Sequence, residues 1–219
     1  MNPIESVRPK DWVNFCCRLC GACCRNLKDQ VMLESLDAYR LARHLRDLGE
    51  VEYIEDVYNQ YAHPDLLDGL YPIFLLNTIG QEESCIFLKD GRCSVYEARP
   101  KTCRLYPFTV NTGQRGKAFE YYKCMDCHAS HFSEGRALVK DWTYQNFSSE
   151  DRAFLTAESA AIPELSRLLR ALGPGGLEKN LFTFLYHRYF NYDLDRPFMP
   201  QYAENLEGLK KALQEARRG

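Results

Sequence analysis

The stretch FCCRLCGACCR, residues 15–25, places five cysteines within nine consecutive positions. A structural disulfide stabilises a protein mainly by joining distant parts of the chain, because this restricts the unfolded state most. Five neighbouring thiols cannot do this for one another. A metal ion or cluster draws several thiolates onto one small centre, and soft thiolates suit zinc, cuprous copper and iron–sulfur clusters. The crowding therefore indicates a metal-binding site.

The spacing of three of these cysteines favours an iron–sulfur cluster. Cys17, Cys20 and Cys23 form a CxxCxxC run, which lets one loop supply three corners of a cluster, as in bacterial ferredoxins. The CxxxCP tail of the ferredoxins is missing, because Cys24 follows directly. Side chains of adjacent residues generally diverge, so Cys23 and Cys24 are expected to face two different centres or one bridged cluster.

Two further cysteines, Cys85 and Cys93, lie in CIFLKDGRCSVY, which predicts a β-hairpin around Asp90 and Gly91. A two-residue turn would pair Leu88 with Cys93 and place the two thiols on opposite faces of the hairpin. A three-residue loop would place both thiols on one face, where they could share a metal. The sequence leaves both registers open.

The segment RPKTCRLYPF carries Cys103 between two prolines that bracket one or two turns of chain. Cys124 and Cys127 then form a CxxC pair, and zinc sites often combine such pairs from separated segments. With His128 the pair spells CxxCH, the attachment signature of c-type haem. Haem attachment takes place outside the bacterial cytoplasm, and the start of the chain has no apolar run of signal-peptide length. Haem is therefore disfavoured, and His128 and His131 are expected to be ordinary histidines rather than zinc ligands.

The amino-acid composition limits the kinds of partner that the protein is expected to bind. Hydrophobic residues make up 45% of the chain and aromatic residues 13%, enough for a substantial core. The formal net charge of −2 argues against nonspecific binding of nucleic acid. Apolar stretches are too short to span a bilayer, so no membrane partner is expected either. Whether the chain binds another protein stays open. The expected location is the cytoplasm, where reducing conditions leave thiols available for metals.

The distribution of cysteines predicts the domain organisation. All ten lie between Cys16 and Cys127, and none follows. We therefore expect a cysteine-rich metal-binding domain over 1–127, with a short hairpin and helices. A mostly helical C-terminal region over 128–219 would pack on it and supply no metal ligand. The expected fold class is α+β.

Periodicity and capping residues predict the individual elements. Residues 31–33 are β-prone, and Ser35 is expected to cap the helix that follows. Pro163 suits the first position of a helix, so a new helix is expected to begin there and to end at GPGG. The other predicted helices span 36–48, 52–61, 148–161, 177–190 and 204–218.

The order of the cysteine elements resembles a known family. FxCxxCGxCC at 15–24, then Cys85, then CxxYxxRPxxCRxYPF at 93–108 resemble the YkgJ-type cysteine-cluster family, described as zinc- or iron-chelating domains. The resemblance extends from residue 15 to about 127. Cys16 falls at a variable position and is expected to be a small buried apolar group. The resemblance implies metal ligands at Cys17, Cys20, Cys23, Cys24, Cys85, Cys93, Cys103 and Cys124, with supporting positions at Tyr96, Arg99 and Pro100; Cys127 is added from its CxxC spacing alone.

These observations give one expected function and two alternatives. The expected function is an iron–sulfur centre, most naturally 4Fe–4S, with a redox or electron-transfer role. A structural zinc module is the first alternative. Flagellin lysine methylases share this type of cysteine pattern and imply an enzyme that uses S-adenosylmethionine. The chain lacks the glycine-rich strand-to-helix loop that holds nucleotide-like cofactors, and whether it is an enzyme stays open.

Overall fold

The computed structural model describes residues 4–113, 118–125, 132, 134–173 and 175–217. The fold class is α+β, as expected. Contacts divide the chain into two compact units, and the predicted boundary after residue 127 falls inside the first of them. Each unit is built from two separate segments: unit 1 from Met1–Val31 and Asn77–Thr156, and unit 2 from Met32–Leu76 and Ala157–Gly219.

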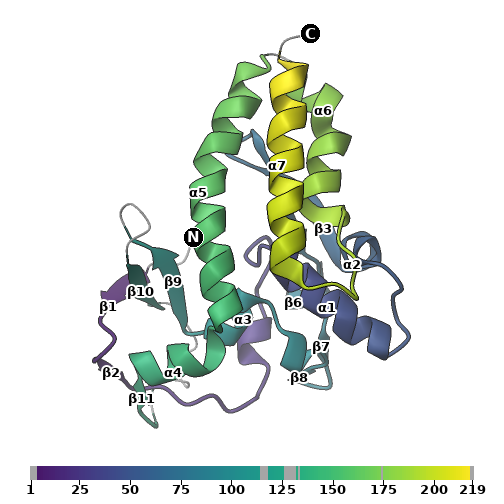
Figure 1. Cartoon of the computed structure of the whole chain (residues 1–219). Coiled ribbons are helices and arrows are strands. Elements are labelled where there is room, and N and C mark those ends of the chain that lie inside the picture. The colour runs from purple at the N-terminus through teal and green to yellow at the C-terminus, as the bar shows by residue number, and fades with distance from the viewer. Residues whose placement is uncertain (1–3, 114–117, 126–131, 133, 174, 218–219) are drawn as a thin grey trace. The chain divides into compact units, whose positions relative to one another are not determined.

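Unit 1 contains a three-stranded antiparallel sheet (Figure 1). Its register places Ile4 opposite Cys124 and Val110 opposite Tyr121, so the start of the chain pairs with a segment far along the sequence. Val110 also packs in a buried cluster with Leu105, which makes one face of the sheet part of the core. In spatial order the strands are β1 (Ile4–Val7), β10 (Phe119–Cys124) and β9 (Phe108–Thr112).

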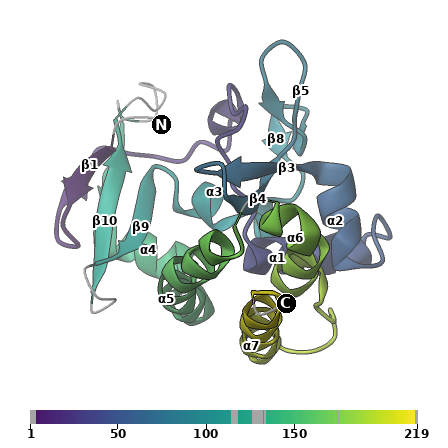
Figure 2. The same ribbon diagram turned by 90° about the horizontal axis from the view of Figure 1, so that it is seen from above.

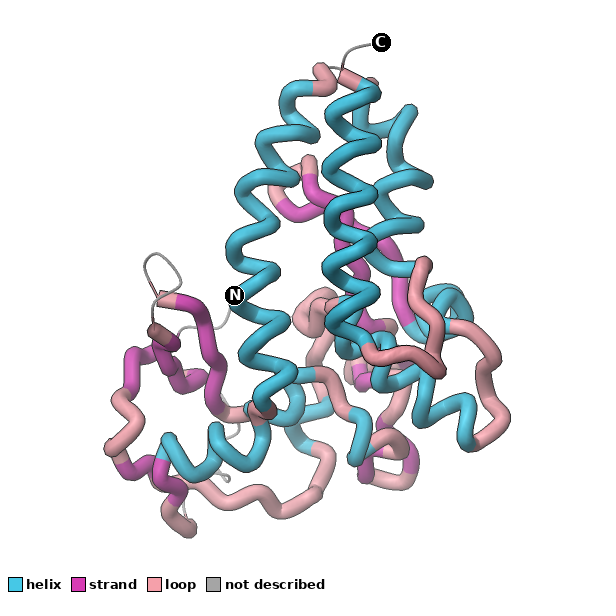
Figure 3. The backbone as a smooth tube through the Cα atoms, viewed as in Figure 1, coloured by secondary structure: helices cyan, strands magenta, loops and turns pink. Residues whose placement is uncertain are grey.

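Short two-stranded ladders and loops make up much of the rest of unit 1 (Figure 3). Each of these strands has only two residues, so side-chain packing and turns must hold the cysteine-bearing segments in place. The ladders are β2 (Trp12–Val13) with β11 (Ala137–Leu138), β5 (Thr78–Ile79) with β6 (Ser84–Cys85), and β7 (Leu88–Lys89) with β8 (Arg92–Cys93).

One helix of unit 1, α5, begins at a recognisable side-chain cap. At the start of α5, the backbone N–H and the hydroxyl of Ser148 donate to a carboxylate oxygen of Asp151, each over 2.8 Å. The N–H of Asp151 donates back to the Ser148 hydroxyl over 3.1 Å, which completes a reciprocal cap. The helices are α3 (Lys101–Leu105), α4 (Val139–Asn146) and α5 (Ser149–Ala171, which continues into unit 2), with 3-10 turns η1 (Ala22–Cys24) and η2 (Tyr96–Ala98).

Unit 2 combines helices with one longer hairpin. Figures 1 and 2 show α6 and α7 side by side, and Lys210 of α7 forms an ion pair with Glu164 of α5 over 3.1 Å. Leu209 and Leu213 of α7 are fully buried. The elements are α1 (Ser35–Asp47), α2 (Ile54–Tyr61), the hairpin β3 (Ala62–Leu67) with β4 (Tyr71–Leu76), α6 (Gly176–Leu185), a π-helical turn η5 (Tyr186–Phe190) and α7 (Phe198–Ala216).

Two sequence-based helix boundaries are wrong. Pro163 does not begin a helix but lies inside the continuous helix α5. An internal proline costs about 3 kcal/mol, and the burial of Ala161 and Leu165 on either side of it offsets this cost. Ser35 is buried as the first residue of α1, and Glu34 occupies the cap position instead.

Three further expectations need smaller corrections. Residues 31–33 form no strand of their own, and only an isolated bridge joins Met32 to Leu75. The helix predicted over 177–190 is α-helical only as far as Leu185 and ends in the π-helical turn. Helix α7 begins at Phe198, six residues earlier than predicted. None of the helices among the described residues combines the length and apolar character needed to cross a lipid bilayer.

Candidate metal centre

Phe15 anchors the beginning of the cysteine stretch in the core of unit 1. Its side chain is only 3% exposed, and its ring meets the ring of Trp142 edge-on, with the centroids 5.1 Å apart. Val13 and Phe15 are buried, whereas Asn14 and Cys16 between and after them are exposed. This alternation follows from an extended backbone, in which successive side chains point to opposite sides. The expectation that Cys16 is buried is therefore wrong.

Gly21 lets the cysteine loop close on the neighbouring hairpin. Its φ is +66°, in the left-handed region that favours glycine. A Cβ added at this position would lie 2.5 Å from the carbonyl oxygen of Gly91 and 2.7 Å from Cδ1 of Leu88. The loop that carries Cys20 and Cys23 therefore packs directly against the turn between β7 and β8.

Gly21→Ala is expected to force this loop away from the hairpin. The added methyl group meets a backbone oxygen, and alanine disfavours the left-handed conformation. We expect a loss of about 1–3 kcal/mol in the free energy of unfolding, with weaker retention of metal. Thermal unfolding and metal analysis measure both. Gly80→Ala is the matched control, because Gly80 has a φ of +71° but no atom within 4 Å of its added Cβ. Equal effects of the two variants would show that the contact with Gly91 is unimportant.

Cys23 and Cys24 face each other within η1. The Cys24 thiol donates a hydrogen bond to the sulfur of Cys23, and this lowers the pKa of Cys23 to about 7, although burial acts in the opposite direction. The same hydrogen bond raises the pKa of Cys24, and burial adds to this rise. The expectation that these adjacent side chains diverge is wrong, because the 3-10 turn brings both sulfurs to one side.

Three more thiols interact electrostatically with this pair. Negative charge at Cys103 or Cys85 would raise the pKa of Cys24 further. Burial raises the pKa of Cys85 to about 11 and also raises that of Cys93, and Cys23 contributes to both shifts. Electrostatic influence of this kind requires the sulfurs to lie near one another. The structure therefore gathers five thiols, from η1, β6, β8 and α3, into one group.

The hairpin has the two-residue turn, with Leu88 opposite Cys93. The expected consequence, thiols on opposite faces of one hairpin, does not follow, because Cys85 belongs to a different ladder and pairs with Thr78. The N–H of Ser94 donates to the carbonyl oxygen of Phe87 over 2.8 Å, which holds the chain between the two ladders. Cys93 contributes to the raised pKa of Cys85, so the two thiols interact.

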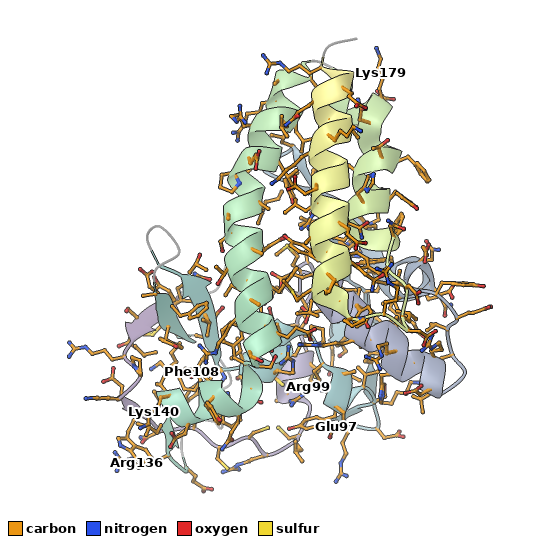
Figure 4. The ribbon with its side chains drawn as sticks, in the orientation of Figure 1. Glu97, Arg99, Phe108, Arg136, Lys140 and Lys179 are labelled. Carbon is orange, nitrogen blue, oxygen red and sulfur yellow. The ribbon has the colours of Figure 1, made fainter. Side chains whose placement is uncertain are left out.

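Arg99 supplies positive charge beside the thiol group. Its guanidinium carbon lies 3.4 Å from the centroid of the Tyr96 ring, and its Nε donates to the Tyr96 carbonyl oxygen over 2.7 Å. The charge of Arg99 favours the thiolate forms of Cys23 and Cys93. Figure 4 labels Arg99 on the segment that leads into α3. Burial raises the pKa of Tyr96, and the neighbouring Cys17 contributes, so Cys17 lies close to this stacked pair.

Cys103 is positioned by the anchoring of α3. The next residue, Arg104, donates to both carboxylate oxygens of Asp151, over 2.8 and 3.0 Å, and to the carbonyl oxygen of Asn146 over 2.9 Å. Its Nε donates to the carbonyl oxygen of Arg99 over 3.0 Å. Asp151 is 1% exposed, so this is a buried, bidentate ion pair that fixes α3 to the start of α5.

The other candidate ligands differ from this group in exposure or bonding, or lie outside the described residues. Cys20 is exposed, as is Cys17. Cys124, the last residue of β10, is disulfide-bonded and offers no thiolate in this form. Cys127, His128 and His131 lie outside the described residues. His187 lies in unit 2, whereas all eight free cysteines of the described residues lie in unit 1.

The donor set fits a thiophilic metal. Thiolate sulfur is the preferred ligand of zinc and of iron–sulfur clusters, and the group combines a thiol of lowered pKa with a nearby cation. Within the described ranges, no three His, Cys, Asp or Glu side chains stand close enough to hold an ion as they are placed. The thiols would therefore have to move closer together on binding, which is a common property of sites whose metal contributes to folding.

Comparison with known proteins gives one match. No curated protein and no solved structure is significantly similar to this chain. A family model named CxxCxxCC, described as "Putative zinc- or iron-chelating domain", matches residues 16–134. This range contains every cysteine of the thiol group as well as Arg99 and Gly21, and it covers more than half of the chain. The chain therefore belongs to the CxxCxxCC family of zinc- or iron-chelating domains.

Proposed function

We propose that the free cysteines of unit 1 bind an iron–sulfur centre and that the protein takes part in electron transfer. The feature that carries this proposal is the gathering of five thiols, from η1, β6, β8 and α3, within electrostatic reach of one another. Tight CxxCxxC spacing adds to it, since one loop can supply several corners of a cluster. The proposed ligands come from Cys17, Cys20, Cys23, Cys24, Cys85, Cys93 and Cys103; Cys124 and Cys127 remain candidates in the reduced protein.

The surrounding residues would hold and tune such a centre. A cluster bound by four thiolates carries net negative charge, and the guanidinium of Arg99 would offset part of it. The stacking of Arg99 on Tyr96 fixes where that charge lies. Arg104 and Asp151 hold the helix that carries Cys103. When bound, a 4Fe–4S cluster supplies reversible one-electron chemistry.

A structural zinc site is the second candidate. The contact of Gly21 with Gly91 brings a CxxC loop, Cys20 to Cys23, against the hairpin that ends in Cys93. Zinc sites commonly take their ligands from two separated turns in this way. Zinc would serve the stability of unit 1 rather than electron transfer, because the ion has no redox chemistry in proteins.

Anaerobic purification is expected to yield protein that contains iron and acid-labile sulfide and has a visible absorption band that dithionite bleaches. The physical reason is the preference of clustered thiolates for iron–sulfur centres. Metal analysis, sulfide analysis and a visible spectrum are the measurements. Colourless protein that contains zinc and unfolds with chelators would support the second candidate instead. Protein that contains neither metal under these conditions, with its thiols oxidised to disulfides, would contradict both.

A further inference from the structure

An open cavity of about 280 Å³ lies in unit 1, outside the thiol group. This volume lies just below the range of about 300–1,000 Å³ that is typical of ligand pockets. Tyr144 on its rim is 82% exposed, so the cavity is accessible to solvent. Its lining residues come from β10, α4 and the first turn of α5: Tyr121, Lys140, Asp141, Thr143, Tyr144 and Arg152.

Arg152 is held in this cavity by two aromatic rings. Its guanidinium carbon lies 4.9 Å from the ring centroid of Phe147 and 5.3 Å from that of Phe119. The two rings meet at 90°, with their centroids 5.6 Å apart, and so form a corner against which the guanidinium rests. Stacking of this kind fixes the planar group and leaves its in-plane N–H donors available.

Asp151, the carboxylate residue next to Arg152 in the sequence, pairs with another arginine. Asp151 gives both of its oxygens to Arg104 and also accepts from Ser148. No ion pair or hydrogen bond of the Arg152 guanidinium or the Lys140 ammonium group occurs among the residues that the structure describes. Lys140 and Arg152 therefore line one cavity with donors that no described side chain takes up. Unsatisfied donors of this kind indicate a site for an anionic ligand.

The charged and aromatic residues that line the cavity indicate the chemical class of the ligand. Lys140 and Arg152 are opposed by one carboxylate, Asp141, which leaves an excess of one positive charge. This balance suits a monoanion better than a phosphate dianion. Tyr121 and Tyr144 add aromatic surface, and the hydroxyl of Thr143 is already used, since it donates to the Val139 carbonyl oxygen over 2.8 Å. Figure 4 labels Lys140 on α4.

From this geometry we infer that the cavity between α4, α5 and β10 is a binding site for a small aromatic carboxylate. The fork of Arg152 receives the two carboxylate oxygens, and Lys140 adds the second positive charge. The ring of the ligand lies against the tyrosines. This site is independent of the metal centre, because it shares none of the thiol group's residues.

Benzoate is expected to bind the purified protein saturably, as followed by NMR titration of the labelled protein at constant ionic strength. Arg152→Gln is expected to weaken benzoate binding at least tenfold, because the bidentate donor is lost. Lys140→Gln is expected to weaken it to a smaller extent, and this second variant decides the question if Arg152→Gln does not fold. Arg170→Gln is the matched control, since it removes an arginine of the same helix that does not line the cavity.

Three results would overturn the inference. The first is the absence of saturable benzoate binding. The second is benzoate affinity that stays unchanged in a folded Arg152→Gln protein or, where that variant does not fold, in Lys140→Gln. The third is inorganic phosphate or the neutral analogue benzyl alcohol binding more tightly than benzoate, because either would contradict recognition of a carboxylate.

Discussion

Cys23→Ser is expected to abolish stable metal binding, with at least a tenfold loss of bound metal per chain. The pKa of the Cys23 thiol is lowered to about 7, and Cys23 influences Cys24, Cys85 and Cys93. A serine hydroxyl is far harder to ionise than a thiol and is a poor ligand for soft metals. The substitution therefore removes a ligand candidate that interacts with three other thiols of the group. Metal analysis after anaerobic purification and gel filtration measures the outcome.

Cys16→Ser is the matched control for this experiment. Cys16 lies in the same stretch but is exposed, and its sulfur lies 4.0 Å from the carbonyl oxygen of Cys17, to which the thiol donates weakly. This variant is expected to retain full metal, since the exposed Cys16 is not one of the five thiols of the group. Retention of metal by Cys23→Ser together with its loss in Cys16→Ser would show that the loop uses the other ligand register.

The sequence predicted the α+β class, because the class depends on local patterns. Spacing identified the CxxCxxC loop, and the Asp90-Gly91 turn identified the hairpin that carries Cys93. The left-handed conformations of these two turn residues, with φ of 50° and 73°, are those that a two-residue hairpin turn requires. The close approach of Gly21 to this hairpin is a contact between separate segments, which local patterns do not contain.

Pairing between distant segments could not be predicted in this way. The sheet joins Ile4–Val7 to β10, and nothing in either segment specifies the other. The hairpin of β3 and β4 was missed for a different reason. All six residues of β4 are buried, so this strand lacks the alternation that identifies a half-buried strand. The gathering of Cys85 with Cys93 follows from such packing between two ladders.

The role of Gly21 was also missed, although a signal was present. A glycine between two metal-ligand candidates often marks a left-handed residue or a close backbone approach. Both occur at Gly21. Arg104, next to Cys103 in the sequence, is a second such residue, because the structure uses it to fix α3 against Asp151. Interactions of this kind depend on residues that are far apart in the sequence.

The buried ion pair of unit 2 leads to the second large effect. Arg188, in the π-helical turn, pairs with Glu158 of α5, and their side chains are 4% and 8% exposed. The hydroxyl of Tyr202 donates to the other carboxylate oxygen of Glu158 over 2.6 Å. Burial acts against the charged form of Arg188, yet Glu158 holds the pKa of Arg188 well above its usual value. Arg188 therefore keeps its positive charge within the core.

Arg188→Met is expected to lower the free energy of unfolding by about 3–5 kcal/mol, because it leaves the Glu158 carboxylate buried without its counter-charge. Replacing both residues by apolar ones, with Glu158→Leu added, is expected to recover most of this loss, since no charge then remains to be desolvated. Urea unfolding followed by circular dichroism measures both variants. Recovery in the double variant is the sign that desolvation, and not the loss of packing by the arginine stem, causes the effect.

An exposed ion pair of the same unit provides the comparison. Arg196 and Glu204 lie 3.5 Å apart, and their side chains are 53% and 66% exposed. Arg196→Met is expected to cost at most about 1 kcal/mol, because solvent already screens the charges of this pair. A cost for Arg188→Met as small as this would mean that water reaches Glu158 and replaces the lost guanidinium. The core around the π-helical turn would then open easily, and the buried pair would contribute little to holding α5, the π-helical turn and α7 together.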